Sequence, residues 1–172
     1  MKVLNKYETV DPIDWCKKNI LLDYGSFNPA NHPLIVEPFQ SLANGRGKTI
    51  GLIGSVQHIK TLLSQLWHLY ALQVEPGRAA MYDLTEAALK EFSDDKFTPL
   101  IDSTDAVLDL IPNQAYRRTK FFTSTNFGAI RLLSANVLAA RNSKTLERIT
   151  CDEAWAYKDN WLDQIRDRMS SY

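Results

Sequence analysis

Two short stretches of the chain carry residue types that together could bind and hydrolyse a nucleoside triphosphate. The first, GSVQHIKT, spans residues 54–61 and follows the apolar segment 49–53. The second is the pair Asp152–Glu153, which ends the segment ITCDE at 149–153. A loop between a strand and a helix presents backbone N–H groups and the positive end of the helix dipole, which suits a chain of phosphates. The two stretches together predict a nucleotide site more strongly than either does alone.

The side chains in these stretches have distinct expected roles. We expect Lys60 to reach the terminal phosphates and the Thr61 hydroxyl to contact Mg²⁺. We expect Asp152 to hold the same ion through its water shell, and Glu153 to orient and deprotonate the attacking water. The residues expected to surround the nucleotide are Ser55, Val56, Gln57, His58, Ile59, Lys60 and Thr61. The alternatives are an ordinary strand–turn–helix junction and an exposed Asp-Glu pair at a helix start.

One position departs from the usual phosphate-binding loop, G-x-x-x-x-G-K-[ST]. Ile59 stands where the second glycine is usual, and a β-branched residue resists a positive φ and brings a side chain close to the phosphates. The loop geometry therefore differs, or nucleotide binding is weaker. A nearby GKT at 47–49 is interpreted as a turn, because a strand rather than a helix is expected after Lys48.

Composition places the chain among globular proteins of one domain. It has 172 residues, 45% hydrophobic and 23% charged, with no net charge. No apolar run approaches the roughly 20 residues that span a bilayer, and the first residues lack the pattern of a signal peptide. Cys16 and Cys151 lie in unrelated contexts, which favours reduced thiols in a cytosolic protein.

The charge is unevenly distributed along the chain. Residues 81–115 hold eight acidic and two basic residues, whereas residues 116–150 hold seven basic residues and one glutamate. The basic segment could serve a phosphate-rich partner, or the two segments could neutralise each other as solvated faces. Trp67, Trp155 and Trp161 are expected to pack in the core rather than to stack on bases.

The pattern of apolar residues predicts strands alternating with helices. Helices are expected at 11–22, with Asp11 as N-cap and Pro12 at N1, and at about 38–42, 60–73, 85–96, 99–111 and 159–170. Strands are expected at 49–53, 78–84 and 147–152, with a hairpin formed by 119–123 and 128–134. This alternation predicts an α/β fold with a mainly parallel sheet flanked by helices.

Four stretches in this order give the chain a resemblance to the ATPase domain of the large terminase subunit of tailed phages, of the lambda type. EPFQ at 37–40 resembles the family's adenine-contacting motif, and an amide such as Gln40 can pair with an adenine edge. Residues 55–61 resemble the loop S-x-Q-x-G-K-T. Residues 82–101 resemble the segment that follows the second strand, and LSAN at 133–136 with LERITCDE at 146–153 resembles the stretch that ends in the Walker B strand.

The resemblance implies a P-loop NTPase-like fold of the RecA/ASCE type and a motor that uses ATP and Mg²⁺ to package double-stranded phage DNA into a procapsid. It implies one ATPase domain over 1–172, with an N-terminal helical segment at 1–45 and a P-loop core at 46–172. The implied partners are the phage genome, the small terminase subunit, the portal protein and a homo-oligomeric ring, in the host cytoplasm and not at a membrane.

Two positions depart from the family pattern. Asp83 stands where the family has proline, and Ile59 stands where it has glycine. The likeness also stops soon after Glu153, so the resemblance implies a truncated ATPase fragment without the family's nuclease domain.

Other functions remain open on the sequence. Arg141, Lys144 and Arg148 could supply a charge-neutralising arginine, for which Arg141 is our candidate, or could touch DNA phosphates; a purely solubilising role is the alternative. A helicase-like nucleic-acid translocase shares the same core. A third alternative is a degenerate nucleotide-binding assembly module, which would bind the nucleotide without hydrolysing it. Ile59 in place of glycine would then indicate the loss of hydrolysis.

Overall fold

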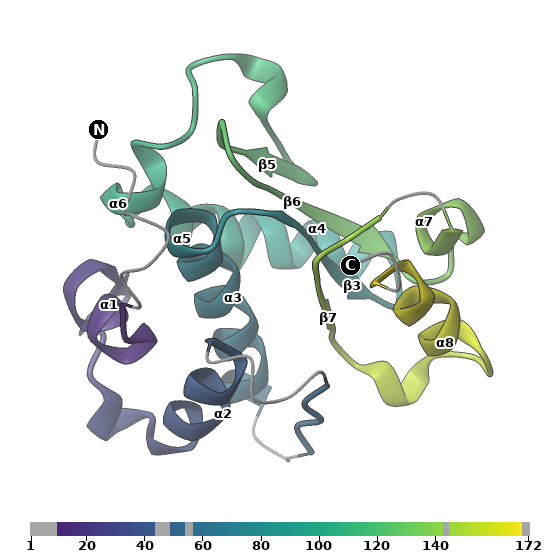
Figure 1. The fold of residues 1–172 in the computed structure, drawn as a ribbon, viewed down its shortest axis with the longest axis horizontal. Coiled ribbons are helices and arrows are strands. Elements are labelled where there is room, and N and C mark those ends of the chain that lie inside the picture. Colours follow the sequence, from purple (N-terminus) through teal and green to yellow (C-terminus); the bar gives the residue numbers. More distant parts are fainter. Residues whose placement is uncertain (1–9, 44–48, 54–56, 143–144, 170–172) are drawn as a thin grey trace.

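A five-stranded sheet with helices on both faces forms the centre of the computed structural model, which describes residues 10–43, 49–53, 57–142 and 145–169 (Figure 1). The helices are α1 (Pro12–Asn19), α2 (Pro33–Ala43), α3 (Gln57–Val74), α4 (Glu86–Phe92), α5 (Thr98–Asp102), α6 (Asp105–Leu108), α7 (Leu138–Asn142) and α8 (Trp161–Arg166). The strands are β1 (Leu21–Leu22), β2 (Gly25–Ser26), β3 (Arg78–Asp83), β4 (Arg118–Thr119), β5 (Phe122–Ser124), β6 (Ala129–Ser134) and β7 (Arg148–Cys151).

The strand order in the main sheet is β4-β5-β6-β3-β7. β3 runs parallel to both neighbours, with Ala79 opposite Ile130 of β6 and Arg148 of β7. β4, β5 and β6 pair antiparallel. The prediction of an α/β fold is therefore confirmed, but the sheet is mixed rather than mainly parallel, because the predicted hairpin joins the same sheet as the parallel strands.

The strand predicted at 49–53 is wrong: this segment has no regular secondary structure. Ile53 is fully exposed and Leu52 is 39% exposed. A strand needs a neighbour that accepts and donates backbone hydrogen bonds, and no described strand pairs with this segment. The turn predicted around Lys48 lies outside the described residues.

The helices follow the sequence prediction more closely. α3 begins three residues earlier than expected, and α2 begins at Pro33 and includes Pro38. Thr85 caps α4 by accepting the N–H of Ala88 at 3.2 Å. α4 continues through a π-helical turn at Ser93–Phe97 into α5, so the two predicted helices form one helical run. Among the described residues, no helix is both long and apolar enough to cross a bilayer.

The alternating side chains of β3 separate two hydrophobic cores. Ala79 and Met81 belong to the larger core, which also contains residues of α1 through α6. Ala80 and Tyr82 belong to the smaller core with Trp161 and residues of α7 and α8. Figure 1 shows α1–α3 and the α7–α8 pair on opposite sides of β3 and β7. This arrangement leaves the ends of β3 and β7 next to α3 on one face of the sheet.

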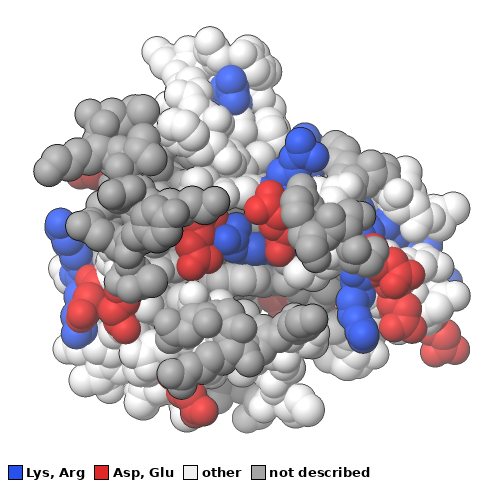
Figure 2. Space-filling view, viewed as in Figure 1, with Lys and Arg blue, Asp and Glu red and all other residues white. Residues whose placement is uncertain are grey.

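The two oppositely charged segments pair with each other. Arg118 contacts Asp102 at 2.6 Å, and Lys120 contacts Asp94 at 2.9 Å. Figure 2 shows acidic and basic side chains interspersed on the face that it presents. These contacts favour mutual neutralisation of the two segments.

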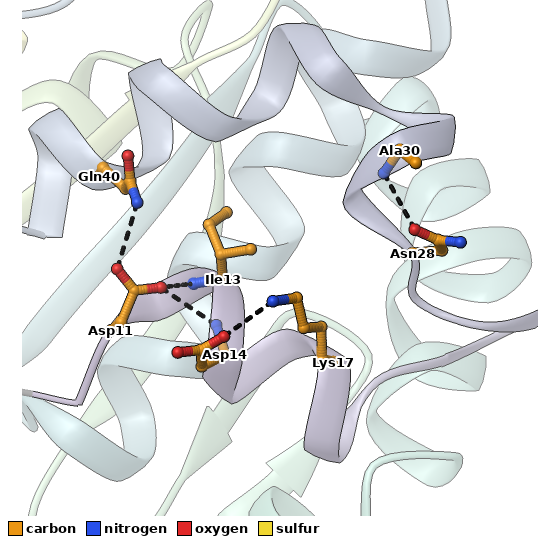
Figure 3. Close-up of polar contacts among 7 residues, drawn as sticks. All are labelled: Asp11, Ile13, Asp14, Lys17, Asn28, Ala30 and Gln40. Carbon is orange, nitrogen blue, oxygen red and sulfur yellow. Dashed lines mark hydrogen bonds and ion pairs between the residues drawn. The ribbon is translucent and has the colours of Figure 1, made fainter.

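Asp11 caps α1 and links it to α2 (Figure 3). Its Oδ1 accepts the N–H of Ile13 at 2.8 Å and of Asp14 at 3.1 Å, and its Oδ2 accepts a hydrogen bond from the Gln40 side chain at 3.2 Å. Asp14 forms an ion pair with Lys17 at the surface. The predicted N-cap is thus confirmed, and it also holds a second helix.

Replacing Asp11 with alanine is expected to lower the free energy of unfolding by about 1 to 2 kcal/mol, because orphan helix N–H groups lose their acceptor. Asp14→Ala, one turn away, removes only an exposed ion pair and should have a much smaller effect. Urea unfolding of the two variants measures the difference. Equal losses would show that Asp11 does not act as a cap.

Candidate nucleotide site

The carboxyl ends of β3 and β7 lie side by side. The two strands are parallel, with Tyr82 opposite Cys151, and the N–H of Asp152 donates to the carbonyl of Tyr82 at 2.9 Å. Asp83 ends β3, and Asp152 and Glu153 follow β7 directly. Open α/β sheets bind ligands at this edge, and here it carries three carboxylates.

The first turns of α3 meet this edge. The Thr61 hydroxyl donates to Oδ2 of Asp152 at 3.1 Å, and Nζ of Lys60 lies 3.9 Å from Oε1 of Glu153. The side chains of Lys60 and Glu153 are 27% and 44% exposed, so solvent and a ligand can reach both. Residues that lie far apart in the sequence are therefore joined at one place.

Glu153 has an unusual backbone conformation. Its φ of 47° and ψ of 35° place it in the left-handed region, which costs free energy for a residue with a side chain. Its N–H donates to Oδ1 of Asp152 at 3.0 Å, and its carboxylate accepts a hydrogen bond from the indole N–H of Trp155. The turn thus fixes the direction of the Glu153 side chain relative to Asp152.

Trp155 is 82% exposed, so the prediction that it packs in the core is wrong. The left-handed turn at Glu153 directs the following 3-10 helix (Ala154–Ala156) away from the smaller core. Trp67 and Trp161 are each 9% exposed and confirm the prediction for those two residues.

The negative charge at this edge alters the protonation of Asp83. Burial raises the pKa of the Asp83 carboxyl, and Asp152 and Glu153 raise it further, whereas the hydrogen bond from the N–H of Leu84 lowers it. Like charges close together favour a proton or a cation between them. Lys60 supplies one such cation. Whether a metal ion fits as well depends on the oxygen atoms that neighbouring side chains offer to it.

The oxygens of Thr61 and Asp152 fit Mg²⁺. Magnesium prefers oxygen ligands and keeps several of its waters when it binds a protein. The hydrogen bond of 3.1 Å from the Thr61 hydroxyl to the Asp152 carboxylate places two such oxygens side by side, one to contact the ion and one to hold a water of its shell. The described residues contain no group of three or more His, Cys, Asp or Glu side chains arranged to hold a metal. A magnesium ion here would therefore depend on phosphate and water ligands, as is common for this ion.

The remaining loop residues divide between described and undescribed parts of the chain. Ser55 and Val56 lie outside the described residues, and Gln57 and His58 form the start of α3. Ile59 lies in the first turn of α3, and its side chain packs against the larger core. The helix thus begins before the position where glycine is usual, and a helical φ suits isoleucine there.

Gln40, expected to contact adenine, lies on α2 and donates to Asp11. The bond uses the amide nitrogen, which is also the donor that an adenine edge requires. The role of Gln40 in adenine recognition stays a prediction.

Arg141 is buried, with 7% of its surface exposed. Its Nε donates to Oε1 of Gln164 at 2.7 Å, its Nη1 donates to the carbonyl of Ala135, and its guanidinium lies 4.4 Å from the ring centre of Trp161. These contacts tie α7 to α8 within the smaller core. A catalytic role for Arg141 stays a prediction and would require the side chain to leave all three partners.

Changing Arg141 to lysine is expected to lower the free energy of unfolding by about 2 kcal/mol, since lysine cannot reproduce the planar fork and leaves a buried acceptor unpaired. Arg166→Lys, at an exposed position of α8, serves as the matched control and should change little. Chemical unfolding curves compare the two. Indistinguishable curves would contradict the structural role of Arg141.

Of the other two basic candidates, Arg148 begins β7, at the opposite end of the strand from Asp152. Arg148 lies on β7 and pairs with Glu75 at 2.9 Å. Lys144 lies outside the described residues. Cys16 and Cys151 are free thiols, as predicted.

Sequence reasoning missed two features of this region. Asp83 was noted only as a departure from proline, although its place at the end of β3 puts it beside the motif pair. Thr150, on β7 two residues before Asp152, accepts a hydrogen bond from Ser64 of α3 and forms another with His68. Two-residue alternation along β7 is the signal that could have identified Thr150.

Comparison with known proteins points to one family. No curated protein and no solved structure matches the chain. Residues 23–166, most of the chain and all of α2 through α8, match the family described as phage terminase large subunit gpA, ATPase domain. The chain therefore belongs to the family of ATPase domains of phage terminase large subunits.

Proposed function

We propose that this chain binds Mg-ATP where α3 begins and β7 ends, and that it hydrolyses ATP to drive double-stranded phage DNA into a procapsid. The observation that carries the proposal is the paired contact of Thr61 with Asp152 at 3.1 Å and of Lys60 with Glu153 at 3.9 Å. Membership of the terminase ATPase family supports a phage DNA-packaging ATPase at family level.

Each of the four residues has a role that fits its position. Lys60, on the first turn of α3, binds the terminal phosphates with the help of the helix dipole. Thr61 and Asp152 would hold Mg²⁺, which would offset the negative charge of the phosphates. Glu153 orients a water for attack and accepts its proton.

Lys60 and Glu153 form an ion pair at 3.9 Å. Phosphates compete with Glu153 for the Lys60 ammonium, because both are anions within its reach. Nucleotide binding then releases the Glu153 carboxylate from Lys60, while the indole N–H of Trp155 still holds it. The site therefore exchanges one charge-assisted contact for another when it binds ATP.

The wider assignments follow the same proposal. Residues 1–172 form one P-loop ATPase domain, with an N-terminal helical segment at 1–45 and a core at 46–172. Gln40 contacts adenine, and Ser55 and Val56 line the phosphates. The DNA, the small terminase subunit, the portal protein and further copies in a ring are the partners, and the host cytoplasm is the location.

Phosphate release from ATP, measured with and without double-stranded DNA, tests the proposal. We expect Mg²⁺-dependent turnover that rises with DNA and is absent from Lys60→Ala prepared in parallel. Mg-ATP binding without turnover in either condition would instead favour a non-hydrolysing nucleotide-binding module. Turnover equal in the wild type and in Lys60→Ala would overturn the proposed site.

A further inference from the structure

A seam of polar side chains connects α3 to β7 behind the candidate site. Thr61, Ser64 and His68 follow one another at helical spacing and so lie on one face of α3. All three bond to β7 or to the residue after it: Thr61 to Asp152, and both Ser64 and His68 to Thr150. Polar contacts at three successive turns fix the helix against the strand in both rotation and translation.

Thr150 is the centre of this seam. Its hydroxyl lies 3.0 Å from the Ser64 hydroxyl, which donates to it, and 2.8 Å from Nε2 of His68. Side chains two residues apart on a strand point to the same face of the sheet, so Thr150 and Asp152 face α3 together. A shift of Thr150 relative to α3 would therefore move Asp152 relative to Thr61.

His68 is fully buried, so it cannot touch a nucleotide. Burial, together with the smaller effect of the nearby Arg148, lowers the pKa of His68 to about 3. The ring is therefore neutral at physiological pH and makes a directed hydrogen bond rather than an ion pair. A buried polar group of this kind costs stability unless it is bonded, so its one bond to Thr150 is a strong constraint on the position of β7.

We propose that Thr150 and His68 are positioning residues that hold Asp152 at the Thr61 hydroxyl, so that the pair is placed to receive the Mg²⁺ of Mg-ATP, Thr61 directly and Asp152 through a water of its shell. The inference rests on the proposed function of the site. It predicts that loss of the Thr150 hydroxyl weakens the use of Mg²⁺ specifically, because Lys60 contacts the phosphates independently of Thr150.

The test compares wild type, Thr150→Val and Thr150→Ser in their binding of a fluorescent ATP analogue, with Mg²⁺ titrated from zero. Valine keeps the shape of threonine and removes the hydroxyl, and serine restores the hydroxyl. We expect valine to raise the Mg²⁺ concentration for half-maximal binding about tenfold. Metal-free affinity should stay within about twofold, and serine should return the Mg²⁺ dependence to within about threefold of wild type.

Each outcome separates the inference from the proposed function. A wild type that binds with Mg²⁺ beside a valine variant with the same Mg²⁺ dependence overturns the inference alone, as does failure of serine to rescue. A wild type without Mg²⁺-dependent binding overturns the proposed function and the inference with it. Should Thr150→Val not fold, Ser64→Ala at a half-buried position removes one bond of the seam, and a shift of about threefold in the same direction is then expected.

Discussion

Lys60→Ala is expected to lower the affinity of the chain for Mg-ATP by about 100-fold, the largest binding defect of any single substitution. A charge-assisted contact to phosphate is worth about 1.5 to 3 kcal/mol, and its loss corresponds to a factor of that size. Lys60 is the cation that the structure places next to Glu153, at 3.9 Å. Calorimetric titration with ATP and Mg²⁺ measures the change.

Lys48→Ala is the matched control for this prediction. Lys48 belongs to the GKT at 47–49, which resembles a phosphate-binding loop by its letters and lies outside the described residues. We expect its loss to leave the affinity within about twofold, because the described residues that follow it, 49–53, form no helix whose dipole could assist a phosphate contact. Equal defects in the two variants would contradict the assignment of the loop to residues 54–61.

Glu153→Gln is expected to lower ATP turnover by about 100-fold or more while binding persists, since a general base contributes roughly 10² to 10⁴ in rate. Glutamine keeps the size of glutamate and an acceptor for the Trp155 indole N–H, but it cannot take a proton from water. Loss of the negative charge also frees Lys60 from its ion pair. We therefore expect nucleotide affinity to be unchanged or higher. Single-turnover phosphate release and equilibrium binding separate the two effects.

Asp159→Asn controls for the general loss of a carboxylate near this region, because Asp159 is exposed and follows the same strand. It should keep wild-type turnover. Full turnover in Glu153→Gln would show that another group accepts the proton, and Asp83 at the end of β3 would then be the first residue to examine.

Local features of the fold could be predicted where neighbouring residues determine the structure. α3 follows from an apolar stripe, α1 from Asp11 and Pro12, and α4 from Thr85, since periodicity and capping act within a few residues. β7 and the strand–acid junction at Asp152 follow from the short segment RITC, which is followed directly by two acids. The meeting of Thr61 with Asp152 was expected from the chemistry that both motifs share.

Features that depend on distant partners could not be predicted. Residues 49–53 have the composition of a strand, but a strand exists only with a neighbour to pair with. Trp155 is a large aromatic residue and yet is exposed. It follows Glu153, whose left-handed backbone conformation turns the chain. Arg141 is charged in type but buried, because Trp161 and Gln164 lie beside it in the fold. The seam from His68 to Thr150 joins a helix and a strand whose contacting residues lie 82 positions apart in the sequence, so no local pattern predicts it.

The most direct test of the account is nuclear magnetic resonance of the chain with Mn²⁺ replacing Mg²⁺ in complex with ATP. A paramagnetic ion broadens the amide signals of the residues closest to it. We expect the signals of Thr61 and Asp152 to disappear when Mn-ATP is added, while those of β5, such as Thr123 near the opposite end of the sheet, remain. Broadening centred elsewhere, or none at these two residues at saturating Mn-ATP, would contradict a metal–nucleotide site between α3 and β7.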